Sequence, residues 1–172
     1  MTAQKFFFRV AALLLFFFST ALSLATEPGI KSARELLLAN KAACVILKDG
    51  KIILQENGRG VAPLLDAYDK LGANMQGTVI VDKVIGRATA AIAICGKARH
   101  VHAEIMSEDA KAFLQAHGIT ASHTQLVPRI LNRKRDGLCP MEQTVTGITD
   151  PAKALSALRK KLADMSPAPA KK

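Results

Sequence analysis

The segment CVILKDGKIILQ, residues 44–55, constrains the fold of this chain more than any other stretch. Two runs of apolar and β-branched residues flank Asp49 and Gly50. An Asp-Gly pair between such runs is a preferred two-residue loop of a type I′ β-hairpin, because both loop positions need a positive φ. The segment therefore predicts two antiparallel strands joined by a tight turn.

Helical periodicity and short strand-like runs alternate along the rest of the chain. Residues 61–71 place apolar side chains on one helical face before Gly72, whereas GTVIV is a short buried run. The first predicted helix begins near Ala33, after the capping box Ser32-x-x-Glu35, and the hairpin follows it. Next come a helix over 61–71, a strand over 77–81 and a helix that is capped by Asp82 and runs to Ile94. The last predicted elements are a strand over 98–106, a helix from Ser107 to Gly118, a strand over 122–127 and a helix from Pro151.

This order predicts an α/β fold, because strands that alternate with crossover helices pair in parallel. We expect a three-layer α/β/α sandwich with a mixed five-stranded sheet. In strand 98–106, Val101, Ala103 and Ile105 should point to one face, and His100, His102 and Glu104 to the other. We expect one domain over residues 32–148, a C-terminal helix over 149–165 and a disordered tail, rich in Pro and Ala, over 166–172.

The first 25 residues have the pattern of a secretory signal peptide. Lys5 and Arg9 precede an apolar run from Val10 to Leu24, and Ser23-Leu24-Ala25 provides small residues where a signal peptidase cleaves. The run is short for a membrane span, although an uncleaved N-terminal anchor is an alternative. We expect cleavage after Ala25, secretion or a periplasmic location, and no stable membrane insertion afterwards. Removal of 25 of the 172 residues leaves 147, a usual size for one domain.

The chain is basic, with a formal net charge of +10. Loss of Lys5 and Arg9 with the signal leaves about +8, a balance that favours anionic ligands or surfaces. The densest basic groups are Arg129 with residues 133–135, and residues 159–161. An ordinary solvated surface is the simpler explanation of these groups and the one that we favour. Nucleic acid is not an expected partner of an exported protein, and the sequence does not predict an oligomeric state.

Three cysteines, Cys44, Cys95 and Cys139, remain in the exported form. In an oxidising compartment they could form one disulfide and leave one thiol. The sequence does not select one of the three pairings.

The stretch HVHAEIMS contains His-Ala-Glu, residues 102–104. In nucleoside and nucleobase deaminases, His-x-Glu and a later Pro-Cys-x-x-Cys bind zinc, and the glutamate transfers protons. This raises the question of whether the chain is a zinc deaminase.

Four segments resemble a known family. They are KAACVILKDGKIILQENGRGVAPLLDAYD, VIVDKVIGRATAA, SEDAKAFLQAHGI and LVPRILNRKRDGLCPME, and they cover roughly Ser32 to Thr144. The chain is similar to a "domain of unknown function" family of short, uncharacterised bacterial proteins. The resemblance implies a cytidine-deaminase-like fold. It implies the fold more strongly than any activity.

Given that fold, the zinc ligands should lie at the starts of two neighbouring helices. Here these starts are predicted at Asp82-Lys83-Val84 and Ser107-Glu108-Asp109, which offer neither thiolate nor imidazole. His102 lies within a strand, and Cys139-Pro140-Met141-Glu142 has Cys and Pro in the reverse order without a second Cys. Since a catalytic zinc needs about three protein ligands, we interpret His-Ala-Glu as a coincidence and expect no metal and no other cofactor.

A different metal site is the alternative for the strand. His100, His102 and Glu104 would place three candidate ligands on one strand face. A polar strand face beside helix ends explains the same spacing, and no partner for these ligands is evident.

The helix starts still predict a pocket that favours an anion. Backbone N–H groups at helix N-termini carry partial positive charge, to which Lys83 would add a full charge. The candidate ligand-binding residues are Asp82, Lys83, Ser107, Glu108, Asn132, Arg133, Gly137 and Glu142. Lys83 and Cys139 are the candidate catalytic residues, the latter as a nucleophile near basic side chains.

Each of these residues also has a purely structural explanation. Asp82 and Ser107 are natural helix caps, Glu108 complements a helix dipole, and Cys139 could be a disulfide partner. Two functions remain open. One is a site for a small anionic or nucleotide-like ligand, enzymatic or not. The other is a non-catalytic interaction domain that uses a basic surface.

We predict that the exported form begins at Thr26. Ser23-Leu24-Ala25 satisfies the small-residue requirement of signal peptidase, so the intact mass of the exported protein should lack residues 1–25. A full-length mass in the membrane fraction would instead favour an uncleaved anchor.

Overall fold

The computed structural model describes residues 27–165, which form one five-stranded mixed sheet with the order β2-β1-β3-β4-β5. The strands are β1 Cys44–Lys48, β2 Lys51–Glu56, β3 Val79–Ile85, β4 His100–Ser107 and β5 Thr120–Val127. β1 pairs antiparallel with both β2 and β3, whereas β3, β4 and β5 are parallel. The predicted α/β fold with a mixed five-stranded sheet is confirmed.

The predicted hairpin is confirmed at the turn itself. β1 ends at Lys48 and β2 begins at Lys51, so Asp49 and Gly50 form the two-residue connection. Both have positive φ, 51° and 74°, as a type I′ turn requires.

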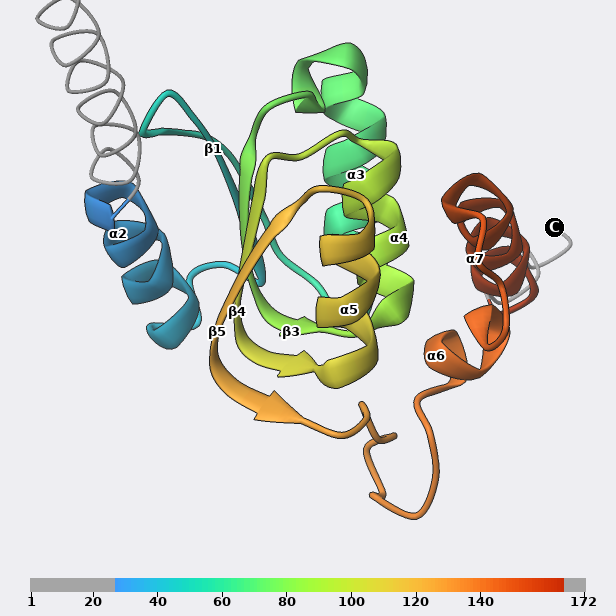
Figure 1. Ribbon diagram of the computed structural model, residues 1–172. Helices are drawn as coiled ribbons and strands as arrows, with labels where there is room; N and C mark the ends of the chain where they lie inside the picture. The colour runs from blue at the N-terminus through green and yellow to red at the C-terminus, as the bar shows by residue number, and fades with distance from the viewer. Residues whose placement is uncertain (1–26, 166–172) are drawn as a thin grey trace, which may run out of the picture.

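Helices cover both faces of the sheet (Figure 1). α2 lies on one face, and α3, α4 and α5 lie on the other, with α6 and α7 outside α4. Their bounds are α2 Glu27–Leu38, α3 Ala62–Leu71, α4 Arg87–Cys95, α5 Glu108–Ala116, α6 Pro140–Val145 and α7 Pro151–Met165, and a 3-10 helix, η1, spans Gly72–Met75. Among residues 27–165, none of the helices is both long and apolar enough to cross a membrane.

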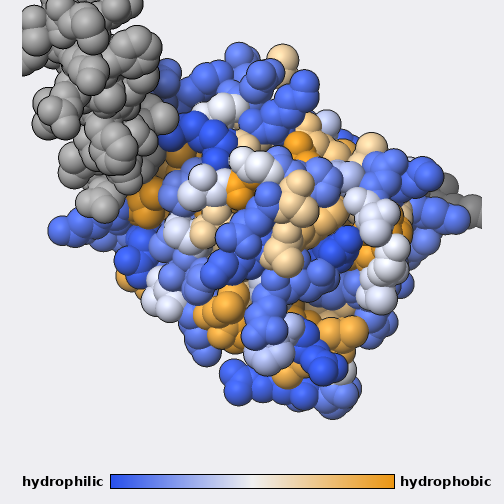
Figure 2. Space-filling model, viewed as in Figure 1, coloured by the Kyte–Doolittle hydropathy of each residue, from blue (hydrophilic) through white to orange (hydrophobic). Residues whose placement is uncertain are grey.

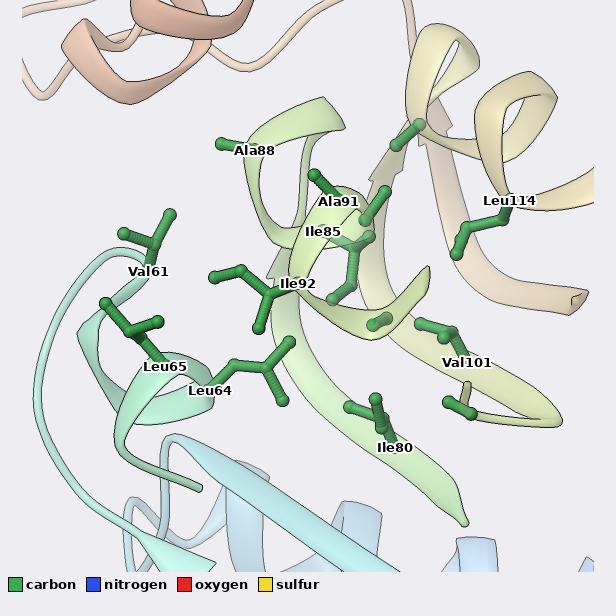
Figure 3. Close-up of a cluster of buried hydrophobic side chains, with 14 of the residues drawn as sticks. Val61, Leu64, Leu65, Ile80, Ile85, Ala88, Ala91, Ile92, Val101 and Leu114 are labelled. Atoms are coloured by element: carbon green, nitrogen blue, oxygen red, sulfur yellow. The ribbon is translucent and has the colours of Figure 1, made fainter. Parts of the chain in front are cut away.

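The main core surrounds α4. Residues 88–93 of this helix are all buried, because the sheet lies on one side and α7 on the other. Figure 3 shows Ile92 between Leu64 of α3 and the strands, with Ile80, Val101 and Leu114 in the same cluster. A helix that is apolar on all sides is expected only where it is buried all round.

A second core joins α2 to the opposite face. Ala33 and Leu37 of α2 pack against Val45, Val79 and Val81. Beside this core, the Arg34 guanidinium reaches the Glu104 carboxylate, at 2.6 Å from Nε and 3.0 Å from Nη2. As predicted, Glu104 lies on the face opposite Val101 and Ala103, both of which are in the main core.

The predicted boundary between β3 and α4 is wrong. Asp82 does not cap a helix, because β3 continues through Lys83 and Val84 to Ile85 and α4 begins at Arg87. The strand continues because Val84 and Ile85 pair with Ile105 and Met106 of β4. Tertiary pairing therefore overrides the capping preference of Asp82.

Two further boundaries differ from the sequence predictions. α2 begins at Glu27, ahead of the capping box expected at Ser32. The region expected to be a loop after β5 contains α6 and an isolated antiparallel bridge between Leu131 and Leu138. The predicted signal peptide (1–25) and the predicted disordered tail (166–172) lie outside the described residues. Cys44, Cys95 and Cys139 are all free thiols.

Asp82 instead lies buried in the sheet, opposite Cys44 of β1. Its Oδ1 accepts a hydrogen bond from the Val84 N–H at 3.0 Å. Burial raises the pKa of this carboxyl to about 7, because the charged form is poorly solvated, although hydrogen bonds to the carboxylate oppose the shift. On the other side of Cys44 lies Glu56, whose carboxylate binds the Lys70 ammonium at 2.6 Å.

We predict that Asp82 makes the folded chain less stable as the pH rises. Its folded pKa of about 7 exceeds the ordinary value of 3.8 for an aspartate, so the stabilisation by the bound proton is complete below pH 3.8 and is lost as the pH rises through about 7. The total loss is roughly 4 kcal/mol. Asp82→Asn should remove this contribution, so its free energy of unfolding should depend less on pH between 5 and 8 than that of wild type.

Asp69→Asn is the matched control for this measurement. Asp69 is half exposed and bound to Arg159, and the hydrogen bond from that guanidinium lowers its pKa. This variant should therefore keep the wild-type loss of stability between pH 5 and 8 in denaturant titrations. If Asp82→Asn and wild type lose equal stability over that range, Asp82 is not the group responsible.

Candidate functional site

A pocket lies where α4 and α5 begin, beneath the segment that follows β5. Its volume is about 240 Å³. The lining residues come from both helix starts, from the chain after β5 and from the α6 region. They are Arg87, Ser107, Asp109, Pro128, Arg129, Leu138, Glu142, Thr146 and Gly147.

The N-terminus of α4 is capped by a carboxylate from α6. Glu142 accepts hydrogen bonds from the N–H groups of Arg87 and Ala88, both at 2.9 Å. Gly86 makes this approach possible, because a Cβ there would lie within 2.7 Å of both carboxylate oxygens. Burial raises the pKa of Glu142, and the two N–H groups oppose that shift. An internal anion thus occupies the position at which a helix N-terminus favours negative charge.

Arg87 connects three parts of the chain beside this cap. Its Nη1 lies 2.7 Å from Asp109 Oδ1 of α5, and its Nη2 donates to the Ile148 carbonyl at 2.8 Å. The guanidinium also lies 3.9 Å from the centre of the Phe113 ring, within the range of a cation–π contact. The side chain is only 14% exposed, so Arg87 contributes strongly to the structure of the pocket wall.

The start of α5 is acidic. Ser107 is its N-cap, as predicted, and its Oγ accepts from the Ala110 N–H at 3.2 Å. Glu108 and Asp109 occupy the first turn, where negative charge is favourable. Asp109 lines the pocket, whereas Glu108, a predicted binding residue, does not.

Asp82 and Lys83 are not at the pocket, since both belong to β3. The Lys83 ammonium donates to Asn40 Oδ1 at 2.8 Å, on the chain between α2 and β1. Lys83 therefore does not supply the pocket with the positive charge that the sequence predicted.

The predicted residues from the chain before α6 are also largely outside the pocket lining. Asn132 and Gly137 close a small loop, in which the Asn132 N–H donates to the Gly137 carbonyl at 2.8 Å. Arg133 is exposed in the same loop. Cys139 is the N-cap of α6, and its side chain packs against the main core. Of the predicted site residues, only Ser107 and Glu142 line the pocket.

The sequence predictions missed Arg87, Asp109 and Arg129 as pocket residues. A usable signal for Arg87 was present, because Gly86 separates the β-branched run of β3 from the Ala-rich run of α4. Such a glycine suits a helix N-cap. Arg129 was identified only as one of a basic group.

The polar face of β4 is used for internal contacts. Ser122 Oγ lies 2.7 Å from His100 Nε2 and 2.9 Å from His102 Nδ1, and burial lowers the pKa of both imidazoles. Glu104 is bound by Arg34. In the part of the chain that the structure describes, no group of three or more His, Cys, Asp or Glu side chains is placed to hold a metal ion.

The pocket does not fit the zinc of a deaminase. The first turns of the two helices carry Arg87 and Ala88 in α4, and Glu108 and Asp109 in α5, without a thiolate or an imidazole. The Arg87 guanidinium would repel a cation, and both Glu142 oxygens already accept helix N–H groups. A zinc site needs about three protein ligands with free lone pairs, and these residues do not provide them.

We predict that Gly86→Ala destabilises the fold by about 1–3 kcal/mol, because the added Cβ would displace the carboxylate that caps α4. Gly137→Ala is the matched control, since its Cβ would meet only Asn132 Nδ2, at 3.5 Å. That change should shift stability by about 0.5 kcal/mol or less. Denaturant titration of both variants measures the difference.

A double-mutant cycle tests the physical cause. If Gly86 matters because of Glu142, then Glu142→Ala should cost less in the Gly86→Ala background than in wild type. Additive effects of the two changes would show that the cap is not what Gly86 protects.

Comparisons with known proteins agree with the architecture. The chain is similar to a DUF1893 family protein from Thermotoga maritima, whose crystal structure matches with a TM-score of 0.70 at 23% identity, over 77% of this chain and 88% of that chain. RibD from Acinetobacter baumannii matches at 15% identity and a TM-score of 0.44, over 56% of this chain and 35% of that one. No curated protein matches the chain.

A third solved structure, a diaminohydroxyphosphoribosylaminopyrimidine deaminase/5-amino-6-(5-phosphoribosylamino)uracil reductase from Thermotoga maritima, matches at 17% identity and a TM-score of 0.37, over 59% of this chain and 33% of that chain. This chain therefore spans about a third of the length of that protein and of RibD. The profile of one family, described as "Domain of unknown function (DUF1893)", matches residues 32–162, most of the sequence. The chain belongs to the DUF1893 family.

Proposed function

We propose that this protein binds a small anionic molecule in the pocket between the starts of α4 and α5, and that it does so without zinc. The observation that carries the proposal is the state of the two arginines in the pocket. Arg87 is held by Asp109, Ile148 and Phe113. Arg129 is exposed and forms no side-chain hydrogen bond or ion pair with residues 27–165.

Arg129 is thus the cation in the pocket that can accept a ligand anion. A guanidinium binds phosphate and carboxylate groups through two parallel hydrogen bonds. An anion that pairs with Arg129 would not need to displace Glu142 from the helix. The unpartnered state of Arg129 is also what a binding residue requires, since a residue that is already saturated gains little from a ligand.

The rest of the lining favours hydrogen-bond donors on the same ligand. Asp109 and Glu142 present carboxylate oxygens, and Ser107 presents a hydroxyl. The volume of about 240 Å³ is below the range of roughly 300–1,000 Å³ for drug-sized ligands. A phosphorylated sugar, or the ribose and phosphate of a nucleotide, has this size and this combination of groups.

Covalent catalysis has little support in this geometry. Lys83 and Cys139, the candidates that the sequence suggested, do not line the pocket. Because neither of these two candidates lines the pocket and the lining does not provide a set of zinc ligands, we propose binding as the function and assign no reaction. We also propose that the protein acts outside the cytoplasm, which rests on the signal-like pattern of residues 1–25.

We predict that Arg129→Ala weakens ligand binding about tenfold to a hundredfold, because a hydrogen bond to a charged group contributes on the order of 1.5–3 kcal/mol. The test is a thermal-shift series with ribose 5-phosphate and nucleoside monophosphates. Folding should change little, since Arg129 is exposed and unpaired within the described chain.

Lys83→Ala is the charge-matched control. It removes one exposed hydrogen bond at a residue that does not line the pocket and should leave the response to each compound at the wild-type level. The proposal is wrong if no compound stabilises the wild type, or if both variants lose the response equally.

A further inference from the structure

The chain between β5 and α6 forms a small ordered loop, which we call the basic hairpin and define as residues 129–138. The Leu131–Leu138 bridge and the hydrogen bond from Asn132 N to Gly137 O hold its two arms together. The Cys139 N–H also donates to the Ile130 carbonyl at 3.1 Å. Figure 1 shows this segment extending beyond the end of the sheet, away from the helices that form the core.

The tip of the hairpin carries unneutralised positive charge. Arg133, Lys134 and Arg135 are consecutive and exposed, and their side chains form no hydrogen bond or ion pair with the described residues. The neighbouring Asp136 is held by the Asn132 amide, 2.7 Å away. Together with Arg129, these residues give the hairpin a net charge of +3.

Apolar side chains are exposed close to these charges. Leu131 on the hairpin is 43% exposed, and Leu126 at the end of β5 is 38% exposed. Figure 2 shows hydrophobic residues among hydrophilic ones at the end of the molecule where this segment lies in Figure 1. Residues 126–138 contain no aromatic side chain.

We propose that the basic hairpin docks the protein on a membrane surface that contains anionic lipids. Lysine and arginine attract anionic headgroups, and adjacent aliphatic side chains enter the boundary between headgroups and acyl chains. A single-stranded nucleic acid is a less suitable partner, because base binding generally uses aromatic side chains on which bases stack.

The basic hairpin already has a defined backbone conformation, which favours docking on a membrane. Its backbone hydrogen bonds are formed already, so docking does not require a disordered loop to become ordered. Arg129 and Leu138, at the base of the hairpin, also line the pocket, but the tip residues Arg133, Lys134 and Arg135 do not. The two proposals can therefore be tested separately at the tip.

The experiment is hydrogen–deuterium exchange of the full chain with vesicles of neutral lipid alone and of neutral lipid mixed with anionic lipid. Residues 129–138 should be protected only by the anionic vesicles. A charge-reversed variant, Arg133→Glu with Lys134→Glu, should lose this protection and bind those vesicles at least tenfold more weakly. Each basic residue near such a surface contributes about 1 kcal/mol, or roughly fivefold.

The matched control reverses the same amount of charge elsewhere. Lys153 and Lys160 are exposed on α7, and Lys153→Glu with Lys160→Glu should keep the protection of the hairpin. Three results would overturn the proposal. They are equal protection by neutral vesicles, equal loss in the control variant, or protection by a single-stranded RNA oligomer but not by anionic vesicles.

Discussion

The structure depends on how the N-terminus of a buried helix is satisfied. α4 is buried from residue 88 to residue 93, so the N–H groups at its start cannot rely on bulk water, and an unpaired buried helix end is costly. Glu142 supplies two hydrogen bonds there. The carboxylate comes from a helix more than fifty residues later, so the cap also fixes α6 against the start of α4. The position of α6 is therefore constrained by the hydrogen bonds that the N-terminus of α4 requires.

The same cap explains what this pocket can and cannot do. In a deaminase-like arrangement the two helix starts would hold a metal and its activated water. Here Arg87, whose side chain is 14% exposed, and the Glu142 carboxylate lie at the helix starts, and both are bound by the protein itself. Positive and negative groups are thus paired within the wall, and the exposed Arg129 is the pocket cation left for the ligand anion that we propose.

The sequence predicted the features that depend on neighbouring residues. Local geometry determines the Asp49-Gly50 turn, the N-cap at Ser107 and the helix that starts after Asp150. The alternation of strands and helices along the sequence was enough to predict the fold class. The site required information from distant parts of the chain. Asp82 has a helix-capping side chain, yet pairing of Val84 and Ile85 with β4 extends the strand past it. Nothing local indicates that Glu142 reaches Gly86, because that contact arises only after the sheet, α4 and α6 are assembled.

Stability and the proposed ligand binding therefore depend on different residues of one small pocket. Arg87 and Glu142 are only partly exposed and are bound by other parts of the chain, so their substitution would destabilise the pocket wall and would say little about ligands. Arg129 lies on the rim, where the same charge contributes little to folding. Substitution of Arg129, or of the hairpin tip beyond it, should therefore leave the Glu142 cap on α4 in place. If the proposed binding is correct, substitutions in this chain that change it without unfolding the pocket should lie in the segment after β5.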